Sequence, residues 1–355
     1  MLQLEGDPSV DLDCVLSHAR AYLAQVDLAG VPGWRAGAPF AIRPLAQGEY
    51  NLNYRIRQDG REWVFRVNVD TQIDRDDQIR YEYRALKLLE PTGLTPRPFY
   101  VDDEPGLAVA GDHLGVMVME YLPGRPLDYR RDLTAAARLF ARIHSQPVAE
   151  AENHLIREER PLSMTYAECS RLLPVYLESE LADPALRDYL RQVVAWADEA
   201  RHRESSFLED PWPCIINTEV NSGNFIVHRA QGTIHLVDWE KPLWGDPSQD
   251  ISHFRVPTTT LWKTDYRMGG PDRRAFMEAY RAALPDPHLR DTIEERARLR
   301  DPFNCLRGIS WSAMAWVTYQ TGDHLLQNED TFRKVSEYLD LDFVRGLFDP
   351  YMNAA

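Results

Sequence analysis

The sequence predicts an α+β chain built as two unequal lobes, a small one with an antiparallel sheet and a larger, mainly helical one. The 355 residues allow about two domains or one large two-lobed unit. Extended runs gather in the N-terminal third, and long helical rhythms follow at 164–208 and 271–346. The expected parts are a helical extension over 1–39, an N-terminal lobe over 40–122 and a helical C-terminal lobe over 123–355.

The elements of the N-terminal third follow from their hydrophobic spacing. Apolar residues recur with a helical period over 9–28. Two extended runs between 54 and 67 flank Asp59-Gly60, and this dipeptide is a strong hairpin signal. Residues 74–90 return to a helical stripe, and the apolar run at 115–122 indicates a buried strand that ends at Pro123-Gly124.

The remainder of the chain is mainly helical. A helix is expected over 132–145, ahead of the two long helical stretches. One short extended island interrupts them at 224–238, where turn residues separate two apolar runs. The helix-rich part therefore contains one small hairpin.

Composition excludes several classes of protein. Hydrophobic residues make up 44% and charged residues 27%, which excludes a wholly disordered chain. Asp and Glu number 55 against 40 Lys and Arg, and this excess of negative charge disfavours sequence-blind binding to nucleic acid or anionic membranes.

The cysteines and the hydropathy pattern predict the cellular compartment. The four cysteines are far apart and form no Cys-x-x-Cys pair, which favours free thiols in a reducing compartment. The first residues have neither a basic start nor an apolar core, and no apolar run reaches 18 residues. We therefore expect a cytoplasmic protein without a membrane or nucleic-acid partner.

Polar side chains gather around the extended island. An antiparallel hairpin about Gln231 brings Asn224 and Asp238 to the same open end, because each lies seven residues from Gln231. Glu219 lies five residues before Asn224, on the loop that enters the hairpin. Amide and carboxylate oxygens suit Mg²⁺, and a further carboxylate that orients a hydroxyl is typical of a phosphoryl-transfer site. Ordinary turn residues beside a hairpin are the alternative at this point.

A basic residue in the second strand of the N-terminal lobe points to phosphate chemistry. Strand alternation places Val64 and Arg66 on one face, where Val64 could lie against a base and Arg66 could face phosphates. Glu82 on the following helix could pair with Arg66. An arginine in solvent and an exposed helical glutamate are the alternatives.

In the order of these parts the sequence resembles the aminoglycoside phosphotransferase and choline kinase-like branch of the protein-kinase fold. The family pattern runs His-Gly-Asp, four residues, Asn, and then Asp-Trp or Asp-Phe after a hairpin. Here it reads Asn217-Thr218-Glu219, Asn224 and Asp238-Trp239, and Gly245-Asp246-Pro247 and Asp250 follow. The resemblance covers about 40–255 and implies a protein-kinase-like fold with two lobes.

The resemblance also implies a Mg²⁺-ATP-dependent transfer of the γ-phosphate to a hydroxyl of a small molecule. Asn224 and Asp238 would bind Mg²⁺, and Glu219 would be the catalytic base. The residues that would bind ATP are Gly48, Asn51, Val64, Arg66, Glu82 and the backbone of Glu120 and Leu122. Asp246 and Asp250 would anchor the helical lobe instead.

Three residues depart from the family pattern. Glu219 stands in place of Asp, Asn217 in place of His and Arg66 in place of Lys. Glu remains a carboxylate that can orient a hydroxyl, and Arg can hold phosphate in a bidentate way. The changes at 217 and 219 motivate a second hypothesis, a nucleotide-binding pseudokinase that acts as a regulatory or interaction module. Nucleotidyl transfer from the same fold is a third.

The aromatic residues after Asp238 admit two interpretations. Trp262 follows a polar run that could approach the acceptor, but we expect a helix cap followed by a core tryptophan. Trp311 and Trp316 lie in an apolar helix over 304–320 and are also expected in the core. His144 ends an apolar helix and is expected to be structural.

Overall fold

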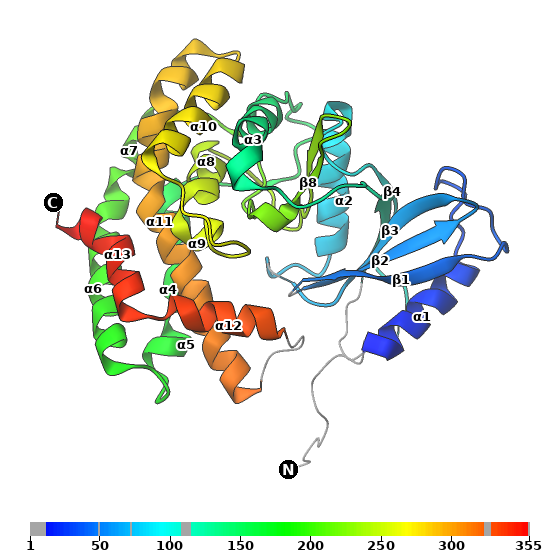
Figure 1. The fold of residues 1–355 in the computed structure, drawn as a ribbon, viewed down its shortest axis with the longest axis horizontal. Coiled ribbons are helices and arrows are strands. Elements are labelled where there is room, and N and C mark those ends of the chain that lie inside the picture. Colours follow the sequence, from blue (N-terminus) through cyan, green and yellow to red (C-terminus); the bar gives the residue numbers. More distant parts are fainter. Residues whose placement is uncertain (1–11, 49, 72, 108–114, 323–327, 354–355) are drawn as a thin grey trace.

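The computed structural model describes residues 12–48, 50–71, 73–107, 115–322 and 328–353, and it confirms the α+β architecture. Figure 1 shows the blue strands of the N-terminal lobe on one side and the green to red helices of the C-terminal lobe on the other. The strands are β1 Ala41–Gln47, β2 Asn51–Gln58, β3 Arg61–Asn68, β4 Pro98–Asp102, β5 Val116–Glu120, β6 Ile156–Arg157, β7 Cys214–Ile216, β8 Phe225–His228, β9 Thr233–Leu236 and β10 Leu243–Gly245. The α-helices are α1 Leu12–Gln25, α2 Gln78–Leu89, α3 Tyr129–His144, α4 Pro161–Leu172, α5 Pro174–Leu177, α6 Pro184–Ala200, α7 Ser205–Glu209, α8 Ser248–Arg255, α9 Pro257–Thr260, α10 Gly270–Ala283, α11 Pro287–Thr321, α12 Glu329–Tyr338 and α13 Leu341–Met352. Short 3₁₀ turns lie at Glu90–Thr92, Arg201–Glu204 and Ser222–Asn224.

The N-terminal lobe is an antiparallel sheet of five strands in the order β1-β2-β3-β5-β4. The predicted turn between β2 and β3 is present, with φ of +51° at Asp59 and +79° at Gly60, as a two-residue I′ hairpin turn requires. Trp63, Phe65 and Val67 pack with α1 on one face, as alternation predicts. The predicted start of that helix, 9–11, lies outside the described residues.

The opposite face of the sheet carries α2, which lies between the lobes (Figure 1). Val64 belongs to the cluster on this side, together with Ile79 and Leu86 of α2. Because Arg66 shares a face with Val64, its side chain also points toward α2. The sheet thus directs the side chain of Arg66 toward the junction of the two lobes.

The connection between the lobes is extended and passes close to the C-terminal hairpin. Arg125 pairs with Val227 through two backbone hydrogen bonds of 3.0 and 2.8 Å. A Cβ on Gly124 would lie 2.6 Å from the side chain of Ile226, so this approach requires glycine. The Pro-Gly break of the sequence is therefore the place where the connection lies against β8.

The C-terminal lobe is organised around α11, whose 35 residues span about 52 Å at 1.5 Å per residue. Its first half holds α8 through the buried pair of Arg255 with Asp301 and through hydrogen bonds from Arg300 to Ser248 and Gln249. Its second half packs against α12. Cluster contacts with α4, α6 and α13 bury its apolar side. No helix among the residues that the structure describes is long and apolar enough to cross a membrane.

The aromatic core beside the hairpin gives a direct stability prediction. Phe140 of α3 is fully buried, with ring centroids 5.7 Å from Phe225, 5.4 Å from Phe254 and 6.3 Å from Phe276. We expect Phe140→Ala to lower the free energy of unfolding by about 3–5 kcal/mol, since it leaves a cavity among three rings. Phe140→Leu fills part of that space and should cost less. Urea unfolding measures both, and a loss below about 1 kcal/mol for the alanine variant would contradict this packing.

Candidate functional site

A cleft of about 620 Å³ lies between the two lobes. Nine of the ten residues that the sequence singled out line it: Gly48, Asn51, Val64, Arg66, Glu120, Leu122, Glu219, Asn224 and Asp238. The tenth, Glu82, lies behind Arg66 and is buried. Residues more than 150 positions apart in the sequence thus meet in one cavity.

One end of the cleft is formed by the sheet and the connection between the lobes. Gly48 closes the turn between β1 and β2, where its N–H donates to Asn51 O at 2.9 Å. The side chain of Asn51 is fixed on both sides, because its Nδ2 donates to Glu240 and its Oδ1 accepts from Asn68 at 3.1 Å. Val64 provides an apolar wall next to Glu120 and Leu122.

Arg66 joins the two lobes. Its Nη1 donates to Glu82 Oε1 at 2.6 Å and its Nη2 lies 3.1 Å from Asp238 Oδ1. Its Nε donates to Asn53 Oδ1 at 3.0 Å. The predicted pair with Glu82 is therefore present, and Glu82 also accepts from the backbone N–H of Trp239 at 3.3 Å. Arg66 and Glu82 together hold the start of the loop that follows β9.

The loop at 217–224 is fixed by a buried carboxylate. Asp250 accepts from the backbone N–H groups of Asn217 and Thr218, both at 2.8 Å, and lies 3.2 Å from His144 Nε2. His144 Nδ1 lies 2.8 Å from Tyr280 Oη, so this histidine is structural, as predicted. Asp250 is fully buried, and its hydrogen bonds fix the backbone at the start of this loop.

Asn217, where the family pattern has His, connects this loop to the loop that carries Asp238. Its Oδ1 accepts from the N–H of Glu219 at 2.9 Å, and its Nδ2 donates to Asp238 O at 2.9 Å. Thr218 and Asp238 both have left-handed backbones, with φ of +70° and +65°. Such strained positions gather at functional sites, where the surroundings must stabilise them.

The open end of the hairpin brings the predicted metal ligands together. Asn224 Nδ2 donates to Glu219 O at 2.6 Å and lies 3.4 Å from Asp238 Oδ2. Because its nitrogen is engaged in this way, the amide oxygen of Asn224 is the atom that suits a cation. An amide oxygen beside a carboxylate fits Mg²⁺, which completes its shell with phosphate and water oxygens. Within the described ranges no three His, Cys, Asp or Glu side chains are grouped to hold a metal.

Glu219 lies beside two cations. Burial alone would raise the pKa of its carboxyl, but the charge of Arg307 and that of Lys241 outweigh this effect and lower the pKa below its ordinary value. Glu219 is therefore a carboxylate at neutral pH. Burial and the nearby charge of Asp238 instead raise the pKa of Glu240 well above its ordinary value.

The far end of the cleft corrects one prediction. Trp262 and Trp311 both line it, with ring centroids 5.6 Å apart. Trp262 also packs against the helical core, as expected, but the expectation that Trp311 is a core residue is wrong. Trp316 packs against the helical core, as expected. Further residues of this end are Glu168, His253, Thr258, Thr259, Lys263, Arg307, Ser312 and Tyr338. Sequence reasoning missed most of them, because no motif connects α4, α8 and α11.

Comparison with known sequences identifies relatives. The sequence pattern of the phosphotransferase enzyme family matches residues 41–300. Thiamine kinases of Shigella boydii serotype 4 and Escherichia coli O17:K52:H18 are 26% and 27% identical over 211 residues, which is 58% of this chain. The chain spans 63% of the length of these curated relatives.

Comparison with solved structures confirms the predicted protein-kinase-like fold. An ethanolamine kinase of Plasmodium vivax has a TM-score of 0.63 at 11% identity, over 98% of this chain and 97% of its own. A choline kinase of Cryptosporidium parvum has a TM-score of 0.62 at 12% identity, over 91% and 94%. At such identities these structures show the fold alone.

Proposed function

We propose, because this chain belongs to the phosphotransferase enzyme family, that it transfers the γ-phosphate of ATP to a hydroxyl of a small molecule. The observation that carries this proposal is the meeting of Arg66, Asp238, Asn224 and Glu219 in one cleft. A cation of the sheet, two ligands for a divalent metal and a further carboxylate are the parts that phosphoryl transfer requires.

The two ends of the cleft suit two substrates. ATP would lie at the end formed by Gly48, Val64 and the backbone of Glu120 and Leu122, with its phosphates toward Arg66. The acceptor would lie at the other end, which contains tryptophans and hydroxyl side chains. Glu219 lines the same cleft, where it would deprotonate the acceptor hydroxyl.

The proposal gives each of the following groups one role in the reaction. Asn224 and Asp238 would hold Mg²⁺, which supplies charge stabilisation on the transferred phosphoryl group when bound. Arg66 would offset negative charge on the phosphates. Glu219, ionised at neutral pH, would orient the acceptor hydroxyl and accept its proton. Glu82 and Asn51 would act as positioning residues for this end of the cleft.

Substitutions of Glu219 test the proposed base. We expect Glu219→Gln to lower the rate of transfer by about 10²–10⁴-fold, because an amide cannot accept the proton. Glu219→Asp keeps the carboxylate and should retain much more activity. The measurement is the initial rate of labelled product formation from γ-labelled Mg·ATP and a pooled extract of small metabolites.

The same assay separates the proposal from the pseudokinase hypothesis. A pseudokinase binds ATP without turnover, so no labelled product would form with the unmutated chain and Glu219→Gln would change nothing. ATP binding measured on the same samples shows that the protein is folded. Unchanged product formation by an active Glu219→Gln variant would contradict the role of Glu219 as the base.

A further inference from the structure

Glu219 is fixed by a residue of the C-terminal lobe that lies 88 positions further along the chain. Arg307 of α11 donates from Nη2 to Glu219 Oε1 at 2.6 Å and from Nη1 to Thr218 O at 2.9 Å. One guanidinium thus binds both the side chain of Glu219 and the backbone just before it. The side chain of Arg307 is 11% exposed, so water competes little for these contacts.

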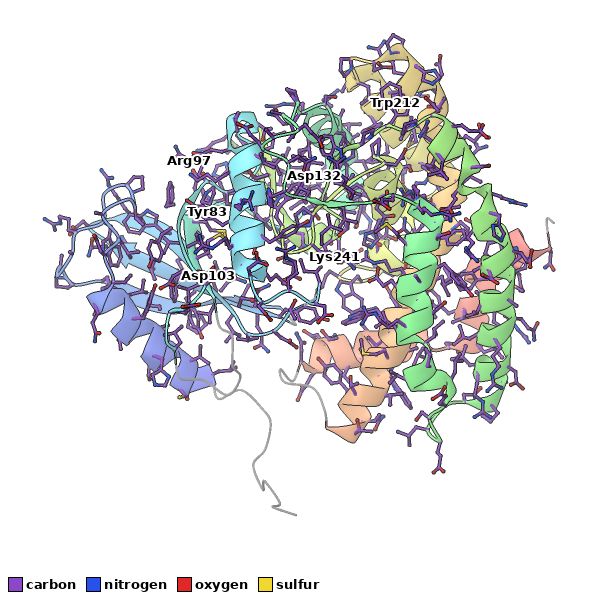
Figure 2. All side chains as sticks on the ribbon, turned by 180° about the vertical axis from the view of Figure 1, so that it is seen from behind. Tyr83, Arg97, Asp103, Asp132, Trp212 and Lys241 are labelled. Carbon is purple, nitrogen blue, oxygen red and sulfur yellow. The ribbon has the colours of Figure 1, made fainter. Side chains whose placement is uncertain are left out.

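Arg307 is itself fixed from behind. Its Nε lies 3.4 Å from Glu168 of α4, which also accepts from Lys241 Nζ at 2.7 Å (Lys241 is labelled in Figure 2). The backbone oxygen of Lys241 accepts from Thr218 Oγ1 at 2.8 Å, and this bond returns the network to the loop that carries Glu219. Two carboxylates and two cations alternate in this network. It joins α4, α11 and both loops of the site.

This network can order the longer side chain that Glu219 has in place of the aspartate of the family pattern. Glutamate has one methylene more than aspartate, and therefore one further torsion that must be ordered. Asp250 and Asn217 hold the backbone at 217–219, whereas Arg307 contacts the carboxylate of Glu219 itself. The planar fork of arginine can fix that side chain relative to the backbone oxygen, whereas the single ammonium of lysine cannot hold both acceptors in the same geometry. A displacement of about 1 Å at such a group can cost about 100-fold in rate.

We propose that Arg307 is a positioning residue for phosphoryl transfer, which holds the Glu219 carboxylate in its working orientation and is itself held by Glu168. This inference rests on the function proposed above. It assigns a role in the reaction to a residue of α11 that no motif of the sequence marks.

Variants of Arg307 test this role by kinetics. We expect Arg307→Lys to lower the rate of labelled product formation at saturating ATP by about 10–100-fold, with the KM for ATP within about twofold of the unmutated value. Arg307→Ala should lose more activity and regain part of it in millimolar guanidinium chloride but not in urea. Free guanidinium can occupy the space left by the Arg307 side chain and bind the Glu219 carboxylate there. If Arg307 served only the stability of the fold, added guanidinium would not raise the rate of the folded variant.

Arg296→Lys is the matched control. Arg296 lies on the same helix, is buried, and donates to Asp246 at 2.6 Å, but it does not line the cleft. This variant should lower the melting temperature and leave the rate per folded molecule unchanged. If Arg307→Lys keeps the full rate, if Arg307→Ala is faster than the unmutated chain, or if guanidinium gives no rescue of folded Arg307→Ala, the positioning role is wrong.

A thermal-unfolding cycle tests the contact without relying on activity. Arg307→Met leaves Glu219 without its guanidinium partner, so we expect the melting temperature to fall, and the added change Glu219→Gln should restore part of the loss. Additive losses would contradict a coupled pair. If the unmutated chain makes no product, the proposed function fails and the positioning role with it, whereas product with a fully active Arg307→Lys overturns the positioning role alone.

Discussion

Asp238→Asn should abolish phosphoryl transfer, with a loss of at least about 10³-fold in rate. The substitution keeps the shape of the side chain and tolerates the left-handed backbone at this position, where φ is +65°. It removes the negative charge of the Asp238 carboxylate, which would hold the metal next to the phosphates and which pairs with Arg66 at 3.1 Å. A metal ion bound at the phosphates supplies several kcal/mol of transition-state stabilisation.

The measurement is the rate of product formation together with ATP affinity, with and without Mg²⁺. We expect Mg²⁺ to strengthen ATP binding to the unmutated chain and to have little effect on the Asp238→Asn variant. The control is Asp103→Asn, because Asp103 forms a surface pair with Arg80 and lies outside the cleft (Asp103 is labelled in Figure 2). An Asp238→Asn variant with full activity would contradict the metal assignment.

Arg66→Met should destabilise the protein and weaken ATP binding at the same time. The side chain of Arg66 is 5% exposed and that of Glu82 is 2% exposed, so the substitution leaves a buried carboxylate without its cation. We expect a loss of about 3–5 kcal/mol in the free energy of unfolding. Arg66→Lys keeps the charge but cannot reach Asn53, Glu82 and Asp238 together, so an intermediate loss is expected.

The double variant Arg66→Met, Glu82→Leu separates the two effects. Removing both charges leaves no Glu82 carboxylate without its cation and should restore part of the stability. The recovery is incomplete because the backbone N–H of Trp239 loses its acceptor. ATP affinity should remain low, since Arg66 then no longer faces the phosphates. Urea unfolding and ATP titration measure the two quantities. Unchanged stability of Arg66→Met would contradict the importance of this pair.

Local patterns account for the parts of the site that the sequence predicts. The predicted turn near Gln231 brings Asn224 and Asp238 to the same end of the hairpin, although the observed register of β8 and β9 is offset by one residue and places Val237 opposite Asn224. Strand alternation likewise places Arg66 on the face of the sheet that α2 covers. Each of these inferences needs only the period of a strand and the position of a turn.

The acceptor end of the cleft depends on contacts that no local pattern contains. Arg307 and Trp311 lie four residues apart and therefore on one side of α11. Buried residues recur along most of this helix, from Leu289 to Val317. Where this long helix passes the cleft follows only from its packing against α4 and α8. Trp262 lies in the turn after α9, and its exposure to the cleft depends on the same packing. Sequence reasoning therefore placed both tryptophans in the core.

The contact between Arg307 and Glu219 joins residues 88 positions apart, so the sequence alone does not reveal it. A glutamate in place of aspartate is compatible with an active enzyme and with a lost one, because the outcome depends on what holds the longer side chain. The structure provides a guanidinium at 2.6 Å from this carboxylate. We therefore propose that Glu219 is a working base.

The most direct test of the central claim follows the phosphate itself. ATP labelled on the γ-phosphate and ATP labelled on the α-phosphate would be incubated in parallel with Mg²⁺, the pooled small-metabolite extract and either the unmutated chain or Asp238→Asn. The proposed function predicts that only the γ label appears on a small-molecule product, and only with the unmutated chain. Transfer of the α label would indicate nucleotidyl transfer, and ATP binding without any labelled product would indicate a pseudokinase. Either result would contradict the proposed phosphotransferase.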